Sequence, residues 1–342
     1  MPPNLQDIAD AAGVGKSTVS LALRNDPRLR EATRERIRKI AAEMGYQRNA
    51  AVSLAMAQIR SRGHSTYQGN LALLNVSHHK DGLSMTSTFR EWVRGCHERG
   101  KKLGYGVDAF WLFEPGWDVR KLMGVLESRN IQGVLVAGIL EHRRLPPEFV
   151  PLGDRYPSVA LGVRAVEPQL HSCLNDQYAT AMTAVREVQK LGYLNPGIVI
   201  GKHVDRLVDH RFAAGFEAMV RELYEIESPP RFTFEDDGRD AFLKWMGKAK
   251  PDVLLTLHDP VRDWLETAEG KVGEGVGLVH LDLSPDHEGW AGMLQNNDLV
   301  GCRALDIIIG QIHRNEAGVP ERPSCVMVES SWRSGETVKR VG

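Results

Sequence analysis

Residues 11–20, with the sequence AAGVGKSTVS, leave two alternatives for the fold of the N-terminal region. The Gly15-Lys16-Ser17 triplet matches the end of the glycine-rich loop that cradles phosphates in nucleotide-binding proteins. The same residues also suit a glycine turn between two short helices, the second of which enters a DNA groove. A phosphate loop requires a glycine at position 10 and a preceding buried strand. Position 10 is an aspartate and residues 5–12 have helical periodicity, which favours the helical alternative.

Three short helices are predicted in the first fifty residues. Asn4 is a suitable N-cap for a helix over residues 5–12, and Gly13 favours the left-handed conformation that ends a helix. Apolar residues at helical spacing predict a second helix from about 16 to 24 and a third from about 31 to 44. Two helices joined by a glycine turn and followed by a third form a helix-turn-helix arrangement.

The charge of the chain is unevenly distributed. Residues 1–62 contain eleven Lys or Arg and six Asp or Glu, a net charge of +5, whereas the remaining residues sum to −6. A basic N-terminal region on an acidic body is typical of a protein whose N-terminal region binds a polyanion. The alternative is a solvated basic helix, because RLREATRERIRKI alone supplies six of the eleven positive charges.

Composition restricts the class of protein. A length of 342 residues predicts two or three domains, and no apolar run is long enough to span a membrane. The N-terminus lacks the features of a secretory signal. The four cysteines lie far apart without a C-x-x-C pair, which argues against a zinc site or a disulfide framework and favours a reducing cytosol.

The segments LQDIADAAGVGKSTVSLALRN and TRERIRKIAAEMGYQRNA resemble the DNA-binding head of the lac repressor family of bacterial transcription regulators. The resemblance implies base contacts from Lys16, Ser17 and Leu21 and phosphate contacts from Thr18 and Ser20, with Arg24 completing the interface of the second helix. Leu21 departs from the arginine that is common in the family, which implies a different operator. Ser17 or Thr18 is alternatively a helix N-cap.

Residues 49–63 resemble the family's hinge helix, which folds on DNA and inserts a leucine into the minor groove. Aligned from Asn49, the inserting position is Ala55, which is too small to unstack bases, while Leu54 and Met56 flank it and offer the required apolar bulk. The alternative is an amphipathic linker without insertion.

From Gly69 onward, short apolar strands alternate with helices, which predicts parallel sheets covered on both faces. The expected strands are 70–76, 105–112, 133–138, 157–162, 197–201, 252–257 and 275–283. The fold class is therefore α/β. Together with the resemblance to the lac repressor family, this implies a helix-turn-helix domain (1–48), a hinge helix and linker (49–67) and a two-lobed, doubly wound effector-binding and dimerisation domain (68–342). The expected N-lobe is about 68–163 plus 297–322, and the expected C-lobe is about 164–296 plus 323–342.

The body resembles the family's effector domain, which is shared with periplasmic sugar-binding proteins. The resemblance implies effector contacts from Phe89, Arg211 and Asp282, and an arginine with an aspartate can serve vicinal hydroxyls. Trp290 offers a stacking face. Other cleft residues are expected after the strand 252–257, at His258 and Asp259, and at the crossover between the halves, at Gln295 and Asn297. A surface salt bridge is the alternative for Arg211, and a core contact is the alternative for Phe89 and for Trp290.

No metal site or catalytic motif is predicted. His78 and His79 are adjacent, so they point in different directions, and no third ligand lies at useful spacing. The sequence has neither a G-x-S-x-G nor an H-E-x-x-H motif. We therefore expect no cofactor and no catalytic residues.

The sequence thus predicts a cytoplasmic, homodimeric transcription regulator, expected to act as a repressor. Its two heads would bind a roughly palindromic operator in double-stranded DNA, and a small, sugar-like effector in the cleft would control that binding. Two alternatives stay open: an enzyme fused to a helix-turn-helix, and a small-molecule-binding protein without a transcriptional role.

Overall fold

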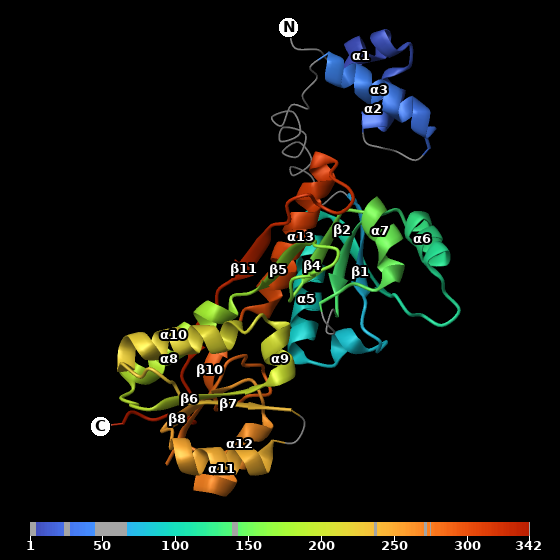
Figure 1. Ribbon diagram of the computed structural model, residues 1–342. Coiled ribbons are helices and arrows are strands. Elements are labelled where there is room, and N and C mark those ends of the chain that lie inside the picture. The colour runs from blue at the N-terminus through green and yellow to red at the C-terminus, as the bar shows by residue number, and fades with distance from the viewer. Residues whose placement is uncertain are drawn as a thin grey trace. The chain divides into compact units, whose positions relative to one another are not determined.

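The computed structural model describes residues 5–23, 28–44, 67–138, 143–235, 238–269, 272–273 and 275–341 (Figure 1). The chain divides into two compact units. The first contains the N-terminal helices and the second contains residues 68–312 and 317–342. In these described ranges, no helix has the length and apolar character needed to cross a membrane.

The head consists of three helices around a small apolar core. They are α1 (Leu5–Ala12), α2 (Lys16–Leu23) and α3 (Glu31–Glu43). Each helix turns its apolar stripe inward, and the fully buried members of the core include Ile8, Val19 and Ile37. The helices predicted from apolar spacing are therefore present, with α2 and α3 ending about where the sequence placed their ends.

The turn between α1 and α2 explains the glycines of the opening motif. Gly13 has a φ of +63°, and the Val14 amide donates to the Ala9 carbonyl at 3.0 Å, which closes the end of α1. The Gly15 carbonyl accepts from the amides of Thr18 and Val19, which starts α2. Because a helix and not a buried strand precedes the turn, the geometry is that of a helix-turn-helix and not of a phosphate loop.

The first lobe of the body is built on a six-stranded parallel sheet. Its strand order is β11-β5-β4-β3-β1-β2. The strands are β1 (Gly69–Asn75), β2 (Tyr105–Trp111), β3 (Ile131–Ala137), β4 (Ser158–Leu161), β5 (His171–Asn175) and β11 (Cys325–Val328). Helices α5 (Ser87–Leu103) and α13 (Asn297–Arg314) pack on one face, while α6 (Val119–Ser128) and α7 (Val150–Arg155) pack on the other. Short 3₁₀ helices, η1 (Gly82–Ser84) and η2 (Pro147–Phe149), lie in the connections.

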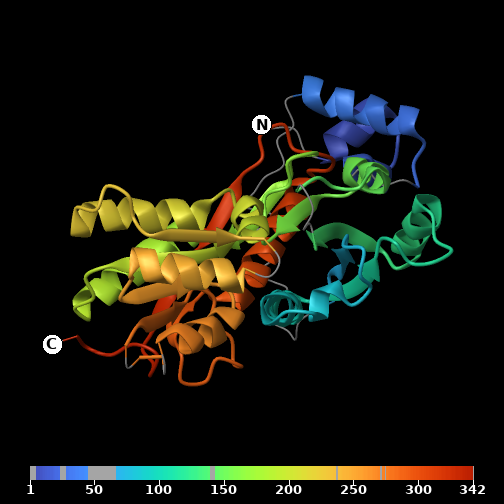
Figure 2. The same ribbon diagram turned by 60° about the horizontal axis from the view of Figure 1, so that its bottom comes forward.

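The second lobe repeats this plan. Its sheet has the order β12-β10-β9-β8-β6-β7, and all neighbouring strands are parallel except β12 against β10. The strands are β6 (Pro196–Gly201), β7 (Arg231–Phe234), β8 (Val253–Thr256), β9 (Gly277–His280), β10 (Ala291–Leu294) and β12 (Ser331–Arg333). Figure 2 shows α8 (Gln177–Lys190) and α10 (Arg211–Tyr224) side by side on one face, and α11 (Arg239–Ala249) and α12 (Pro260–Glu269) on the other. The short helix α9 (Lys202–Leu207) follows β6.

The chain crosses between the lobes three times: after β5, after β10 and after β11. Strand β5 and strand β11 belong to the first sheet, whereas the sequence placed residues 164–296 and 323–342 in the second lobe. These two strands, HSCLN and CVMV, are short, and β5 has polar residues at both ends. They therefore lack the long apolar run that revealed the other strands of the first sheet.

Candidate DNA-binding and effector sites

Helix α2 presents its first residues to solvent. Val19 and Ala22 face the core and have no exposed surface. The opposite side of the helix therefore faces solvent. Lys16 and Ser17 are exposed, and Thr18 and Leu21 are half-buried. The side chain of Ser20 and the residues Arg24, Asn49, Leu54, Ala55 and Met56 lie outside the described residues.

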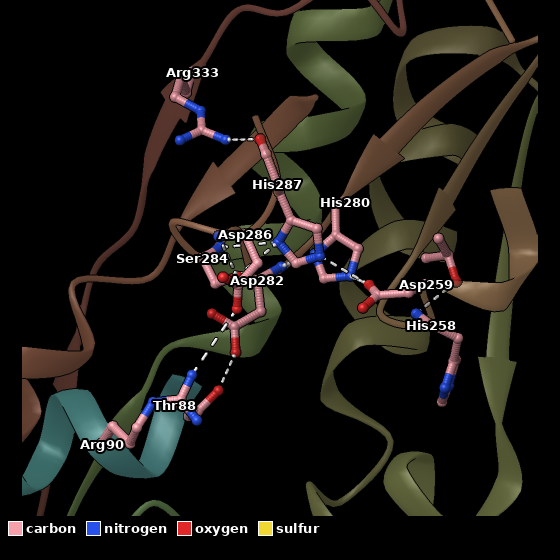
Figure 3. A network of polar contacts seen from close by, with 11 residues as sticks. Thr88, Arg90, His258, Asp259, His280, Asp282, Ser284, Asp286, His287 and Arg333 are labelled. Atoms are coloured by element: carbon pink, nitrogen blue, oxygen red, sulfur yellow. Dashed lines mark hydrogen bonds and ion pairs between the residues drawn. The ribbon is translucent and has the colours of Figure 1, made fainter. Parts of the chain in front are cut away.

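Asp282 lies where three segments of the body meet (Figure 3). It follows β9 in the second lobe, and its Oδ2 accepts a hydrogen bond from Thr88 Oγ1 on α5 of the first lobe at 2.8 Å. Its Oδ1 accepts from Asn297 Nδ2, at the start of α13, at 3.0 Å. Burial raises the pKa of Asp282 above its ordinary value, while the hydrogen bonds from Thr88 and Asn297 act in the opposite direction. The structure thus brings two predicted residues, Asp282 and Asn297, into direct contact.

Two aromatic rings support this contact from the first lobe. Trp92 Nε1 donates to Asn297 Oδ1 at 3.3 Å, which orients the Asn297 amide so that its NH₂ group faces Asp282. Phe89 packs edge-on against Trp92 with a centroid distance of 5.0 Å. Phe89 thus contacts the apolar core of the first lobe, in line with its core alternative, and supports the Asp282 site from behind.

Helices α5 and α13 cross closely behind the Asp282 site. A Cβ on Gly95 would lie 1.9 Å from the Asp298 carbonyl oxygen, and a Cβ on Gly301 would lie 2.1 Å from the Trp92 carbonyl oxygen. Only glycine permits this separation. The crossing sets the spacing between Thr88 and Asn297, the two donors of Asp282.

A second cluster of polar side chains, in the second lobe, contains Asp259, His280 and His287. Asp259 Oδ1 lies 2.8 Å from His287 Nε2 and 3.2 Å from His280 Nε2, and the two imidazole rings are tilted against each other with centroids 4.2 Å apart. These imidazoles, His280 first and then His287, hold the pKa of the Asp259 carboxyl well below its usual range. Neither histidine was predicted from the sequence. His280 is the last residue of β9 and His287 lies in a loop, and neither position belongs to a recognisable motif.

This cluster has the residue types of a metal site, since its three ligand atoms lie within 4.8 Å of one another. The remaining hydrogen bonds argue against that use. The Asp282 amide donates to His280 Nδ1 at 3.1 Å, and the Ser284 amide donates to His287 Nδ1 at 2.9 Å. In its neutral form each imidazole would therefore carry its proton on Nε2, which in His287 is hydrogen-bonded to Asp259, and would offer no Nε2 lone pair to a cation.

The order Ser284–His287–Asp259 also resembles the residue set of a hydrolytic triad. Ser284 Oγ lies 3.1 Å from His287 Nδ1, and His287 Nε2 faces Asp259. However, the backbone amide of the same serine already donates to Nδ1, so this nitrogen is not free to accept a proton from the hydroxyl. Ser284 and His287 are also buried. The arrangement orders the turn over 284–287 and has no catalytic geometry.

The predicted residues His258, Trp290 and Gln295 have structural contacts within the body. His258 Nε2 accepts from the Gly201 amide at 2.7 Å, and burial lowers the pKa of His258 to about 4. Trp290 is buried and packs against His287 and under the Arg262 guanidinium, which fits the core alternative. Gln295 Nε2 donates to the Leu281 carbonyl at 2.8 Å and so fixes the crossover after β10.

Arg211 lies at a separate recess between the lobes. It is the first residue of α10 and follows Asp209 and His210, which both have positive φ. Its Nη1 lies 3.1 Å from Met327 Sδ on β11. The recess is small, with a cavity volume of about 10 Å³, and is lined by Gly162, Val163, Arg164, Leu174, Gln177, Leu207, Val208, Asp209 and Arg211. Arg211 and Asp282 therefore contact different groups in this structure and do not share a hydrogen-bond partner.

Comparisons with known proteins agree with this architecture. Residues 4–49 match the model of the family described as bacterial regulatory proteins, lacI family. The HTH-type transcriptional regulator MalR of Streptococcus pneumoniae is 24% identical over 280 residues, which cover 81% of this chain and 79% of the relative. The HTH-type transcriptional repressor CytR of Escherichia coli is 25% identical over 269 residues, which cover 75% and 72%.

Solved structures share the fold over nearly the whole chain. The transcriptional regulator CelR in complex with cellobiose has a TM-score of 0.60 at 18% identity and covers 98% of this chain and 99% of its own. The lac repressor dimer bound to operator and the anti-inducer ONPF has a TM-score of 0.56 at 17% identity, with 99% and 100% covered.

A helix-turn-helix head followed by two parallel-sheet lobes with three crossovers defines a class of DNA-binding regulator that carries a ligand-binding body. The head of the chain matches the model of the lacI family, and over about three quarters or more of its length the chain is similar to HTH-type transcription regulators. The body shares the fold of the lac repressor.

Proposed function

We propose that this protein is a sequence-specific transcription regulator, acting as a repressor, whose DNA binding is controlled by a small hydroxylated effector bound between the lobes. The observation that carries the proposal is the head, in which the exposed start of α2 follows a glycine turn within a region that matches the family model. The curated relatives of the protein are named as transcription regulators, and CytR among them is named as a repressor.

The proposed assembly is a homodimer on a pseudo-palindromic operator. A two-fold dimer presents two recognition helices about one helical turn of DNA apart. Lys16 donates to guanine acceptors, Ser17 pairs with base edges, and Leu21 offers an apolar contact to a thymine methyl group. The lac repressor in the similar structure is a dimer on its operator, which supports this arrangement. We place the protein in the cytoplasm, where its DNA is located.

The proposed control acts through the contact between the lobes. Thr88 of the first lobe donates to Asp282 of the second, and an effector hydroxyl that donates to the same carboxylate would replace it. The effector must bind one arrangement of the lobes better than the other, and a hundredfold preference corresponds to about 2.7 kcal/mol. The cellobiose in the CelR complex supports an effector with several hydroxyl groups.

The test is selection of genomic DNA fragments by the purified full chain at near-physiological salt, followed by sequencing. Salt matters because nonspecific phosphate binding falls steeply as it rises. We expect one enriched palindrome with two half-sites. If no fragment is enriched, either alone or with a metabolite extract added, the proposed function is wrong.

We further propose that the body does not catalyse a reaction, because the triad-like arrangement of Ser284, His287 and Asp259 that the described part of the body contains has no free base. Incubation of the protein with a metabolite extract, followed by mass spectrometry, tests this proposal. Consumption of a metabolite at a rate proportional to protein concentration would contradict it.

A further inference from the structure

His280 and His287 support the turn of the second lobe that contacts the first lobe (Figure 3). The Asp282 amide donates to His280 Nδ1 at 3.1 Å, and the Ser284 amide donates to His287 Nδ1 at 2.9 Å. Asp282 in turn accepts from Thr88 of α5, so the two imidazoles fix the backbone that carries the contact between the lobes. A nitrogen that accepts a hydrogen bond from an amide must keep its lone pair, so this arrangement requires both imidazoles to be neutral.

The opposite side of the two rings favours the charged form instead. Asp259 Oδ1 lies 2.8 Å from His287 Nε2 and 3.2 Å from His280 Nε2, and only the shorter contact has the geometry of a hydrogen bond. His280 Nε2 is buried and has no hydrogen-bond partner among the described residues. A positive charge on this ring would turn its short distance from the Asp259 carboxylate into an ion pair. The neutral form therefore satisfies Nδ1 and leaves Nε2 of His280 unpaired, whereas the charged form does the reverse.

Two neighbouring titratable groups keep a fixed charge in mild acid. The imidazoles hold the pKa of the Asp259 carboxyl well below its usual range, so this group stays a carboxylate. Burial lowers the pKa of His258 to about 4, so this histidine stays neutral. Asp282 also faces the rings, and burial raises its pKa, so a test has to separate its titration from that of the histidines.

Arginines on neighbouring elements supply permanent positive charge around the cluster. Arg333 of β12 donates to the His287 carbonyl at 2.7 Å, and Arg262 of α12 lies over an aromatic ring that packs against both histidines. At the exposed end of the turn, Arg90 of α5 lies 3.9 Å from Asp286. Guanidinium groups keep their charge in proteins, so their effect on the histidines does not change with pH.

We propose that proton uptake by the histidine pair releases the contact between the lobes, so that the two imidazoles act as a pH-sensitive switch. Histidine ordinarily gains or loses its proton between about pH 5 and pH 8. The incoming proton binds Nδ1 of one imidazole, where it faces the N–H group of Asp282 or Ser284, and two donors cannot form a hydrogen bond with each other. The turn must then move, and Asp282 loses the position from which it accepts the Thr88 hydroxyl. This switch needs no ligand and concerns the body alone, so it goes beyond the proposed function.

The test compares the full chain with a Thr88→Val variant by thermal unfolding at several pH values, with EDTA present to remove divalent cations. Tryptophan fluorescence reports on the body, because all seven tryptophans lie beyond residue 68. Titration of the unfolded chain is common to both proteins, so the difference between their unfolding temperatures measures the Thr88 contact. We expect this difference to fall to less than about half of its value between about pH 8 and about pH 5.5, because the contact is complete only while both imidazoles are neutral.

Asparagine in place of each histidine separates the titration of the histidines from that of Asp282. The asparagine side-chain oxygen takes the position of Nδ1 and accepts from the same amide, but it takes up no proton in this pH range. In a chain with both His280→Asn and His287→Asn, we expect the effect of Thr88→Val to stay constant over the same pH range. A fall equal to that of the unsubstituted chain would overturn the proposal and assign the titration to the Asp282 carboxyl.

A second variant tests the proposal even if the loss of both rings unfolds the body. Asp259→Asn keeps an oxygen that accepts from His287 Nε2 but removes the charge that attracts the proton, so the fall should move to lower pH. The matched control is Asp263→Asn, which removes the same charge from an exposed position in the first turn of α12. Equal pH dependence in the Asp259→Asn and Asp263→Asn variants would overturn the role of the histidine pair.

Discussion

The close crossing of α5 and α13 predicts that a larger residue at Gly95 lowers the stability of the body. Gly95→Ala would place a Cβ 1.9 Å from the Asp298 carbonyl oxygen and 2.7 Å from its carbonyl carbon. Both atoms belong to the backbone of α13, so they cannot rotate away as a side chain would. The helices must separate by more than 1 Å to restore an ordinary contact.

Two effects of this substitution oppose each other. Alanine is favoured over glycine in a helix interior by about 1 kcal/mol. Overpacking of a well-packed contact costs about 1–3 kcal/mol, and contact with a rigid backbone places the cost at the upper end. We therefore expect Gly95→Ala to lower the free energy of unfolding by about 2 kcal/mol.

The matched control is Gly124→Ala on α6, where a Cβ would meet nothing within 4 Å. That variant should gain the helix preference without a clash, up to about 1 kcal/mol. Urea unfolding followed by tryptophan fluorescence measures both, and it reports on the body because all seven tryptophans lie beyond residue 68. If Gly95→Ala is as stable as Gly124→Ala, the helices do not cross as described.

Three further predictions concern single side chains. Lys16→Ala should weaken binding to the selected operator by about 1–3 kcal/mol, whereas Lys39→Ala on α3 should have a much smaller effect. Both affinities are measured by fluorescence anisotropy at fixed salt. Equal losses of affinity would contradict a base contact from Lys16. Asp282→Asn should stabilise the body at pH 7. Because the pKa of Asp282 is raised in the folded protein, ionisation of this carboxyl destabilises the fold as the pH rises. The variant should therefore raise the unfolding temperature less at pH 4 than at pH 7. An equal rise at both pH values would refute the argument. Gln177→Met should leave the unfolding temperature unchanged or higher, and a clearly lower unfolding temperature would show that the amide is hydrogen-bonded in the folded protein.

The elements of the fold that follow from local pattern could be predicted from the sequence. Helices α1, α2 and α3 were recognisable because apolar spacing, Gly13 and the turn residues agree. The long central strands were recognisable because burial on both faces requires a continuous apolar run. Strands β5 and β11 were missed because both are short, and β5 also has polar residues at both ends.

The candidate site was only partly predictable, for a different reason. Asp282 was expected from the resemblance and Asn297 from its place at the crossover between the halves, but Thr88 lies 194 positions from Asp282 and carries no signal of its own. The same holds for Gln177, whose unsatisfied oxygen is a property of tertiary burial and not of sequence. Contacts between lobes depend on how two separately folded sheets meet, and local pattern does not encode that geometry.

Asp282 joins the lobes through hydrogen bonds from Thr88 and Asn297. The strength of these bonds determines how readily a ligand can replace the contact between the lobes. A buried carboxylate with neutral donors is held at some cost, and any ligand hydroxyl that donates to it competes directly with Thr88. One hydrogen bond to a charged group contributes about 1.5–3 kcal/mol. This corresponds to an affinity change of about tenfold to more than a hundredfold and lies in the usual range of coupling between two sites. A ligand that replaces Thr88 on Asp282 would therefore remove a contact between the lobes and shift the balance between their arrangements by up to about this amount.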